Sequence, residues 1–271
     1  MTITAATKVF AVIGDPVSHS LSPVMHNGWI ADHSLDAVYV ALQLTSDDPV
    51  AAIEALNGFA GLNVTVPHKE AAAKAASRNE GAVANVLRRE DDGTFSGFNT
   101  DGLGFLDSLT EGAPDWRARA RRVLILGSGG AAIGVGQALS PHVDTIHFAN
   151  RTAERGEQAA RSIPNGRTTR WDDLERGFGH ADLIVQTTIL SMADQAEMEW
   201  PVSFCRPNAI IADIVYRPLE TALLASARAR GLTAIDGLGM LIHQGARAFE
   251  IWFGIKPDVV KARQRLLAAL A

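Results

Sequence analysis

The sequence is poor in the features that mark secreted, membrane-bound or metal-dependent proteins. Its 271 residues contain one cysteine, Cys205, which excludes an internal disulfide and fits a protein of a reducing compartment. We expect this cysteine to be a buried, inert thiol. No apolar run is long enough to cross a membrane, and the N-terminus lacks the charged start and long apolar core of a signal peptide. We therefore expect a soluble, cytoplasmic protein.

Other absences narrow the class of function. The net charge is −5 and the basic residues are spread out, so no nucleic-acid footprint is present. The eight histidines show neither HExxH nor paired CxxC spacing, which predicts no metal site. No G-x-S-x-G elbow of a serine hydrolase occurs, and no internal repeat. What remains is an ordinary globular composition, 47% hydrophobic and 20% charged, at a length that suits two domains.

The most informative stretch is VLILGSGGAAIGVGQAL at 123–139. A buried strand is followed by Gly127, Gly129 and Ala132, which fit G-x-G-x-x-A, and then by a helix of small residues. In this pattern the glycines allow a tight turn and bring the backbone close to a pyrophosphate, which the helix amides then face. A tight turn that binds nothing is the alternative.

The end of the next strand reads Asn150-Arg151-Thr152, where a dinucleotide-binding fold places the residue that contacts the ribose. An acidic residue there favours NAD. This chain instead has Arg151, with Arg155 one turn further on, and both suit a 2′-phosphate. The sequence therefore predicts NADP. Two arginines at a solvated helix start are the alternative, although cations there are unfavourable without an anion.

Polar residues also gather in the first hundred positions. A strand over 9–14 precedes a loop with Ser20 and Ser22, and we expect Ser22 to cap a helix over 24–31. A strand over 62–66 carries Asn63 and Thr65 on its polar face, and Lys69 begins the helix that follows. These side chains could meet at a strand end, where α/β proteins bind ligands.

The remaining pattern alternates strands and helices. Asp92-Gly93 predicts a hairpin turn between strands over 83–89 and 93–98. From Val123 to Asp236 the alternation predicts a doubly wound domain with a mostly parallel sheet. Further elements are expected at 37–42, 48–56, 69–78, 103–109, 181–188, 209–215, 221–229, 233–235, 239–252 and 257–270.

Taken together, these motifs resemble the shikimate dehydrogenase family. The matching pieces, in the family's order, are GDPVSHSLSP at 14–23 with His26-Asn27, NVTVPHK at 63–69, NTD at 99–101, GSGGA at 127–131, NRT at 150–152 and GLGML at 237–241 with Gln244. Together they cover nearly the whole chain.

The resemblance implies a fold of two α/β domains. Residues 1–102 and 239–271 would form a substrate domain with a mixed sheet, and 103–238 a Rossmann-type NADP domain with a parallel sheet. The reaction would be reversible hydride transfer between NADPH and 3-dehydroshikimate, with Lys69 and Asp101 as the acid–base pair. A monomer or homodimer is expected.

Two sets of site residues follow from the strand-end pattern and the resemblance. The substrate set is Ser20, Ser22, Asn63, Thr65, Lys69, Asn85, Asp101 and Gln244. The cofactor set is Gly127, Ser128, Gly129, Gly130, Ala131, Asn150, Arg151, Thr152, Arg155, Thr187, Ile214, Tyr216, Gly237 and Met240.

The chain departs from the family pattern at two places. A threonine of the family is replaced by Val86, and the family's Asn-Ala-Thr-Pro-x-Gly-Met becomes QTTILSM at 186–192, which changes Gln186, Ile189 and Ser191. A paralogue acting on quinate, an aminoshikimate or another cyclic hydroxy acid therefore remains an alternative. A non-catalytic NADP-binding regulator is a second one, disfavoured by the presence of Lys69 and Asp101.

Overall fold

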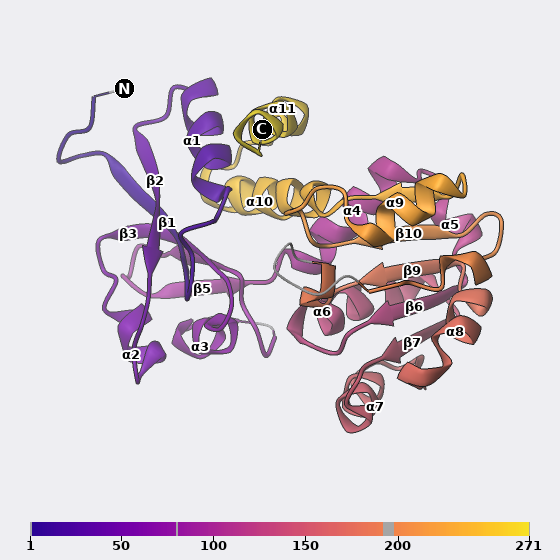
Figure 1. Ribbon diagram of the computed structural model, residues 1–271. Helices are drawn as coiled ribbons and strands as arrows, with labels where there is room; N and C mark the ends of the chain where they lie inside the picture. The colour runs from indigo at the N-terminus through magenta and orange to yellow at the C-terminus, as the bar shows by residue number, and fades with distance from the viewer. Residues whose placement is uncertain (1, 80, 192–197, 271) are drawn as a thin grey trace. The chain divides into compact units, whose positions relative to one another are not determined.

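The computed structural model describes residues 2–79, 81–191 and 198–270 (Figure 1). The chain divides into two compact units. Unit 1 contains residues 1–100 and 244–271, and unit 2 contains residues 101–243. Within the described residues, each unit is built on one sheet with buried hydrophobic side chains packed against it. The fold class expected from the sequence, α/β with a mixed and a parallel sheet, is confirmed.

Unit 1 is built on a five-stranded mixed sheet in the order β2-β1-β3-β4-β5. Its strands are β1 (Lys8–Gly14), β2 (Ala37–Gln43), β3 (Phe59–Val64), β4 (Val86–Arg89) and β5 (Phe95–Phe98). The first three run parallel, and the predicted hairpin of β4 and β5 joins them antiparallel. The helices are α1 (Ser22–Asp32), α2 (Pro49–Glu54), α3 (Lys69–Ala75), α11 (Val259–Leu270) and the second half of α10 (Gly237–Phe253).

Alternate residues of these strands enter different layers. Leu62 and Val64 of β3 pack with Ile53 of α2 and Ala72 of α3, and Figure 1 shows these two helices together in the lower part of the unit. On the opposite side, Phe10 of β1 contacts Trp252 and Phe253 of α10 with ring centroids 5.0 and 4.8 Å apart. The sheet is thus covered on both faces.

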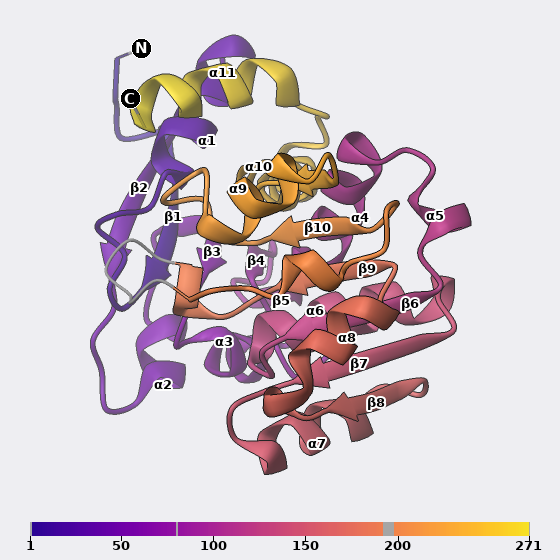
Figure 2. The same cartoon turned by 45° about the vertical axis from the view of Figure 1, so that its right-hand side comes forward.

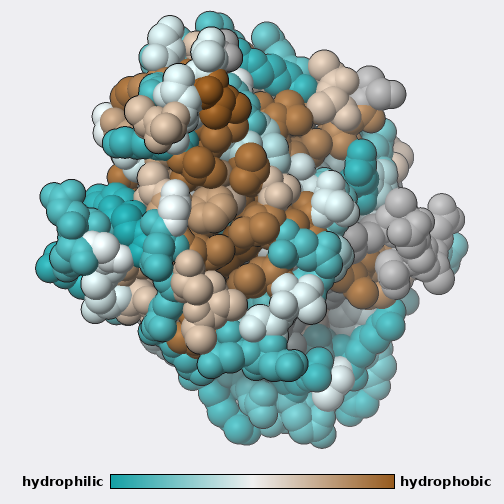
Figure 3. Space-filling view, turned by 90° about the vertical axis from the view of Figure 1, so that its left-hand side faces the viewer, coloured by the Kyte–Doolittle hydropathy of each residue, from teal (hydrophilic) through white to brown (hydrophobic). Residues whose placement is uncertain are grey.

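The edge strand β2 shows the same alternation. Tyr39 is buried, whereas its neighbour Val40 is 38% exposed. In the space-filling view of Figure 3, apolar side chains gather on the face turned to the viewer, and Val24 of α1 is also among the exposed apolar residues of this unit. Strand β2 therefore turns one side, which carries Tyr39, towards the interior of the unit and the other side, which carries Val40, towards solvent.

Unit 2 has six parallel strands in the order β11-β10-β9-β6-β7-β8. They are β6 (Arg122–Leu126), β7 (Thr145–Ala149), β8 (Gly166–Thr169), β9 (Leu183–Gln186), β10 (Ile210–Asp213) and β11 (Thr233–Ile235). The helices are α4 (Asp101–Gly112), α5 (Trp116–Arg119), α6 (Gly130–Leu139), α7 (Ala153–Arg161), α8 (Leu174–His180) and α9 (Ala222–Ala229). Short 3₁₀ turns lie at Ser140–His142, Trp171–Asp173, Ile189–Ser191 and Val202–Phe204.

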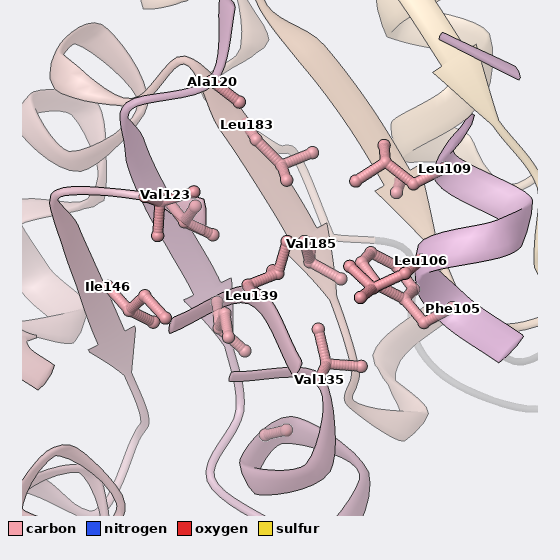
Figure 4. Packing of buried hydrophobic residues seen from close by; sticks show 14 of the residues in the cluster. Phe105, Leu106, Leu109, Ala120, Val123, Val135, Leu139, Ile146, Leu183 and Val185 are labelled. Carbon is pink, nitrogen blue, oxygen red and sulfur yellow. The ribbon is translucent and has the colours of Figure 1, made fainter. Parts of the chain in front are cut away.

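The apolar run of β6 explains why helices cover both faces of this sheet. Val123 and Ile125 point to one core with side chains of α4 and α6, as Figure 4 shows for Val123, Leu106 and Val135. Leu124 and Leu126 point to the other core, with α8 and α9, which both lie on the near side of the sheet in Figure 2. A strand buried on both faces reads as a continuous apolar run rather than an alternation.

One local expectation was wrong. Ser22 does not cap α1: Leu21 occupies the cap position with φ −84° and ψ −6°, and no side-chain cap bond forms. Ser22 is instead the first residue of the helix, and its hydroxyl hydrogen-bonds Tyr39 of β2. A tertiary partner has replaced the local one.

The His26-Asn27 pair of α1 holds Tyr39 from two directions. The Asn27 side chain donates to the Tyr39 carbonyl at 2.8 Å and accepts from the Tyr39 amide at 2.9 Å. The His26 ring stacks on the Tyr39 ring, with centroids 4.3 Å apart and planes 7° from parallel. Among the described residues neither nitrogen of His26 has a hydrogen-bond partner, and burial lowers its pKa to about 3.

This histidine should make the protein less stable as the pH falls. Its pKa is about 6.5 when unfolded and about 3 when folded. The unfolded chain therefore takes up the proton first, so the stabilisation is complete above pH ~6.5 and declines towards pH ~3, at about 1.4 kcal/mol per pH unit. In chemical denaturation between pH 5 and 8, His26→Phe should show a flatter dependence of unfolding free energy on pH than the wild type. Parallel curves would contradict this assignment.

None of the described helices combines the length and apolar character needed to cross a bilayer. Within the same residues, no group of three or more His, Cys, Asp or Glu side chains is placed to hold a metal ion.

Candidate functional site

In unit 1, most of the predicted substrate residues belong to one hydrogen-bonded chain. The Tyr39 hydroxyl donates to Asn63 Oδ1 at 2.7 Å and bonds the hydroxyl of Ser22. The amide of Ser22 donates to the hydroxyl of Ser20 at 3.3 Å. The Asn63 side chain donates in turn to the Asn85 carbonyl at 3.4 Å. Residues from α1, β2 and β3 are thereby tied together.

The same series of hydrogen bonds continues from Asn85 to Thr100 and Gln244. Asn85 Oδ1 accepts from the Thr100 amide at 2.7 Å, and Asn85 Nδ2 lies 3.3 Å from Gln244 Oε1. The Thr100 hydroxyl is 3.0 Å from Asn85 Nδ2 and donates to the Gln244 carbonyl at 3.1 Å. Since Asn85 and Thr100 are almost fully buried, this set is held rigidly.

Thr65 and Lys69 sit at the carboxyl end of β3. The Thr65 amide donates to the Ile13 carbonyl at 2.9 Å, which keeps this residue beside β1. A Cβ on Gly14 would lie 2.4 Å from Thr65 Cγ2, so the close approach requires glycine. Lys69 opens α3 and accepts from the Ala84 amide with its carbonyl at 2.9 Å. Both side chains are partly exposed at the strand end.

Tyr39 and Thr100 were not anticipated from the sequence as parts of this set. Tyr39 lies 24 residues from Asn63 along the chain, and Thr100 lies 144 residues from Gln244. No local pattern links such positions. The sequence offered one indication for Tyr39. It occupies an inward-facing position of the strand that follows the His26-Asn27 motif along the chain.

Burial raises the pKa of Tyr39 well above its ordinary value, although the bond with Ser22 acts in the other direction. The phenol therefore stays neutral, so it can donate to Asn63 while it meets Ser22. Asn63 uses its carbonyl oxygen for Tyr39 and its amino group for Asn85. Asn63 thus links Tyr39 to Asn85 within this series of hydrogen bonds.

Val86 stands directly opposite Asn63 across the β3–β4 pair and is fully buried. The hydroxyl that a threonine would offer here is absent. Asn63 has the Tyr39 and Asn85 bonds nevertheless, so the polar chain is complete without it.

We expect Tyr39→Phe to loosen this set without touching the cofactor residues. The change leaves Asn63 Oδ1 without its donor, which should cost about 1–3 kcal/mol of unfolding free energy. The KM for the hydroxy acid that the sequence predicts as substrate should rise several-fold, because Ser22 and Asn63 lose their common partner. Steady-state kinetics with the predicted substrate and the predicted cofactor varied separately would check this. An unchanged KM for the hydroxy acid, or an equal rise in the KM for the cofactor, would contradict it.

In unit 2, the glycine-rich turn borders a cavity of about 520 Å³. Its lining includes six predicted cofactor residues: Gly127, Ser128, Gly129, Asn150, Arg155 and Thr187. The other lining residues are Ile133, Gln158, Ala159, Thr188 and Ile189. They were not in the predicted cofactor set, although Ile189 was expected to belong to a changed loop next to the nicotinamide. Gln158 lies three positions after Arg155 on α7, a helical spacing that the sequence already offered.

The backbone of the turn has the form that an anion site requires. Gly127 has a φ of +109°, and a Cβ there would lie 2.7 Å from Thr187 Oγ1. At Gly129 and Gly130 a Cβ would meet open space, so the backbone at the start of α6 is accessible. No acidic residue occupies the first turn of α6. The residues present therefore fit the phosphates of a dinucleotide.

The arginines after β7 differ in their surroundings. Arg155 lines the cavity, whereas the guanidinium of Arg151 lies 5.8 Å from the ring centroid of Trp171. The Asn150 side chain donates to the Thr152 carbonyl at 2.9 Å and closes the turn between them. Asn150 and Arg155 are thus brought to one edge of the cavity.

Several predicted cofactor residues do not line this cavity. Ile214 and Met240 pack against the core shared by α4 and α6. A Cβ on Gly237 would lie 2.3 Å from the Ile214 carbonyl oxygen, so the start of α10 closely approaches the chain after β10. Tyr216 follows in that segment, and burial raises its pKa. Gly130, Ala131, Arg151 and Thr152 flank the lining residues in the chain.

Comparison with known proteins agrees with this arrangement. Residues 12–86 match the family model described as shikimate dehydrogenase substrate binding domain, and residues 237–267 match the shikimate 5'-dehydrogenase C-terminal domain. The NADP(+) shikimate dehydrogenase of Rhodospirillum rubrum is 43% identical over 272 residues, which covers 95% of each chain.

Solved structures of related enzymes superpose over almost the whole chain. Shikimate 5-dehydrogenase from Thermus thermophilus, in complex with NADP(H) and shikimate, matches with a TM-score of 0.87 and 32% identity over 97% of this chain and 100% of the other. Quinate dehydrogenase from Corynebacterium glutamicum, in complex with NAD, matches with a TM-score of 0.89 and 29% identity over 97% and 99%. On the sequence identity, the two family models and the shared fold, the chain belongs to the shikimate dehydrogenase family.

Proposed function

We propose that this protein catalyses the reversible, NADP-dependent interconversion of 3-dehydroshikimate and shikimate. The observation that supports this most directly is the polar chain from Ser20 and Ser22 to Gln244, which gathers hydroxyl and carboxamide groups suited to a polyhydroxylated acid. A relative that shares 43% identity over 95% of the chain carries the same activity in its name.

The two units would divide the work. Residues 1–100 with 244–271 would bind the hydroxy acid through Ser20, Ser22, Asn63, Thr65, Lys69, Asn85 and Gln244. Residues 101–243 bind NADP, with Gly127 to Ala131 at the phosphates and Arg151 and Arg155 at the 2′-phosphate. Asp101 opens α4 at the start of this second unit.

Lys69 and Asp101 are the proposed catalytic residues. When bound, the cofactor supplies or accepts the hydride of the reaction. Reduction of the ring ketone develops negative charge on its oxygen, and the Lys69 ammonium stabilises that charge and donates the proton that completes the hydroxyl. In the reverse direction Lys69 takes the proton back. Asp101 accepts a hydrogen bond from a substrate hydroxyl and fixes the orientation of the ring.

The direct test is oxidation of shikimate, quinate and an aminoshikimate, each with NADP⁺ and with NAD⁺, followed by the absorbance of the reduced cofactor. We expect the highest kcat/KM with shikimate and NADP⁺. A preference for quinate or the amino acid would instead direct attention to Val86 and to residues 186–191. Binding of NADP⁺ without turnover of any of these acids would favour a non-catalytic regulator.

A further inference from the structure

The segment after β9 is braced by a side chain of the strand itself. Gln186 is fully buried, and its Oε1 accepts from the Thr188 amide at 2.7 Å. Its Nε2 lies 3.1 Å from the Thr188 carbonyl and 3.0 Å from Ser191 Oγ. Both main-chain groups of Thr188 are therefore tied back to one carboxamide.

Ser191 links this segment to the next strand. Its hydroxyl accepts from Gln186 and donates to the carboxylate of Asp213, the last residue of β10. Asp213 is 1% exposed and also accepts from the Val215 amide at 3.0 Å and the Thr221 hydroxyl at 2.9 Å. Burial raises the pKa of Asp213, whereas these donors act in the opposite direction. The carboxylate thus depends on its donors, and Ser191 is one of them.

Ile189 lies between Thr188 and Ser191, which these hydrogen bonds fix, and it faces the cavity beside Gly127. It lines the cavity together with Thr187 and Thr188, yet it is 62% exposed. Its neighbour Leu190 packs into the core beside α8 and α9, and the Leu190 amide donates to Thr188 Oγ1 at 3.1 Å. Residues on both sides of Ile189 are therefore fixed, and its apolar side chain is held at the rim of a cavity that Ile133 and Ala159 also line.

We propose that Ile189 is an apolar wall for the bound dinucleotide and that Gln186 and Ser191 are positioning residues that hold it there. The inference rests on the proposed function, because it takes the cavity beside Gly127 as the NADP site. The physical gain is pre-organisation: a wall already in place does not have to be ordered when the dinucleotide binds. The three residues that depart from the family pattern in this segment thus act together.

The test is a double-mutant cycle read out as binding rather than turnover. The dissociation constant of NADP⁺ is measured by calorimetry without the hydroxy acid for Ser191→Ala, Ile189→Ala and the double variant. Ser191→Ala should weaken binding about 3- to 10-fold, the usual effect of one hydrogen bond. Ile189→Ala should weaken it by about 10-fold through lost apolar contact. The double variant should bind no more weakly than Ile189→Ala, because Ser191 acts through Ile189.

Two further variants separate positioning from general damage. Ser191→Thr keeps the hydroxyl and should bind NADP⁺ with nearly the wild-type dissociation constant. Gln186→Leu should weaken NADP⁺ binding by about as much as Ser191→Ala. Ser203→Ala, an exposed serine in the turn Val202–Phe204, serves as the matched control. The KM for the hydroxy acid should not change in any of them.

Multiplicative effects of the two single variants, or an unchanged dissociation constant for Ser191→Ala, would overturn the positioning role. If the wild type did not bind NADP⁺ at all, the proposed function would fail and this inference with it. If the wild type bound NADP⁺ but oxidised no hydroxy acid, only the proposed reaction would fail, and the cycle would still decide the role of Ser191.

Discussion

Lys69→Ala should lower kcat by a factor of ~10²–10⁴, the usual effect of losing a general acid. Lys69 opens α3 at the carboxyl end of β3, where it follows Thr65, and it is the proposed proton donor to the developing hydroxyl. The dissociation constant of NADP⁺ should stay unchanged, because the residues around the cofactor cavity lie in unit 2. Steady-state turnover of shikimate and calorimetric binding of NADP⁺ check the two parts separately.

Lys74→Ala is the matched control, since Lys74 lies in the last turn of the same helix and has no proposed role. It should retain wild-type turnover. Near wild-type turnover by Lys69→Ala would remove this lysine from the mechanism, and an equal loss in Lys74→Ala would point to damage of the helix instead.

Replacing Arg151 and Arg155 by alanine should convert the enzyme from NADP preference towards indifference between NADP⁺ and NAD⁺. Charge-assisted hydrogen bonds contribute about 1.5–3 kcal/mol each, so each arginine that bonds the 2′-phosphate should change the KM for NADP⁺ by about 10- to 100-fold. The larger effect is expected at Arg155, which lines the cavity, and the smaller at Arg151, which lies near the ring of Trp171. The KM for NAD⁺ should hardly move.

The same variants carry an internal check on stability. Both arginines lie at the start of α7, where cations oppose the helix dipole unless an anion is bound. Without cofactor the double variant should therefore unfold at the wild-type temperature or slightly above it. Arg161→Ala is the control, because this exposed arginine of α7 pairs with Glu157. An equal loss of affinity for NADP⁺ and NAD⁺ would count against recognition of the 2′-phosphate.

The strands and helices of unit 2 were largely predictable because their signals are local. Three local signals follow one another directly: the apolar run of β6, the turn at Gly127 and the helix of small residues. In each of them the residue types favour the backbone conformation that the structure shows. The boundaries were less accurate: the strand expected at 181–188 is reduced to Leu183–Gln186. The polar residues beyond it leave the sheet because Gln186 bonds the main chain of Thr188.

The candidate residues of unit 1 show where local patterns stop being informative. Ser22 fits a helix cap by its position before Pro23, but the buried Tyr39 hydroxyl is its actual partner. Asn63 lies on the polar strand face as expected, and its carboxamide bonds Tyr39 and Asn85, two partners that the sequence did not indicate. Burial decides these partners, since a polar group removed from water takes the hydrogen bond that the fold brings within reach.

The amino-acid sequence by itself determined the α/β class, the glycine turn, the two arginines after β7 and the set of polar residues that resembles a shikimate dehydrogenase. These features depend on residue types at short spacings, which the chain carries before it folds. Only the tertiary structure decided that Tyr39 and Thr100 complete the polar chain, and that Gln186, Ser191 and Asp213 brace Ile189 beside the cavity. Tyr39, Thr100 and Asp213 come from strands or segments distant from their partners in the sequence, and they meet them because the packing within each unit brings those elements together.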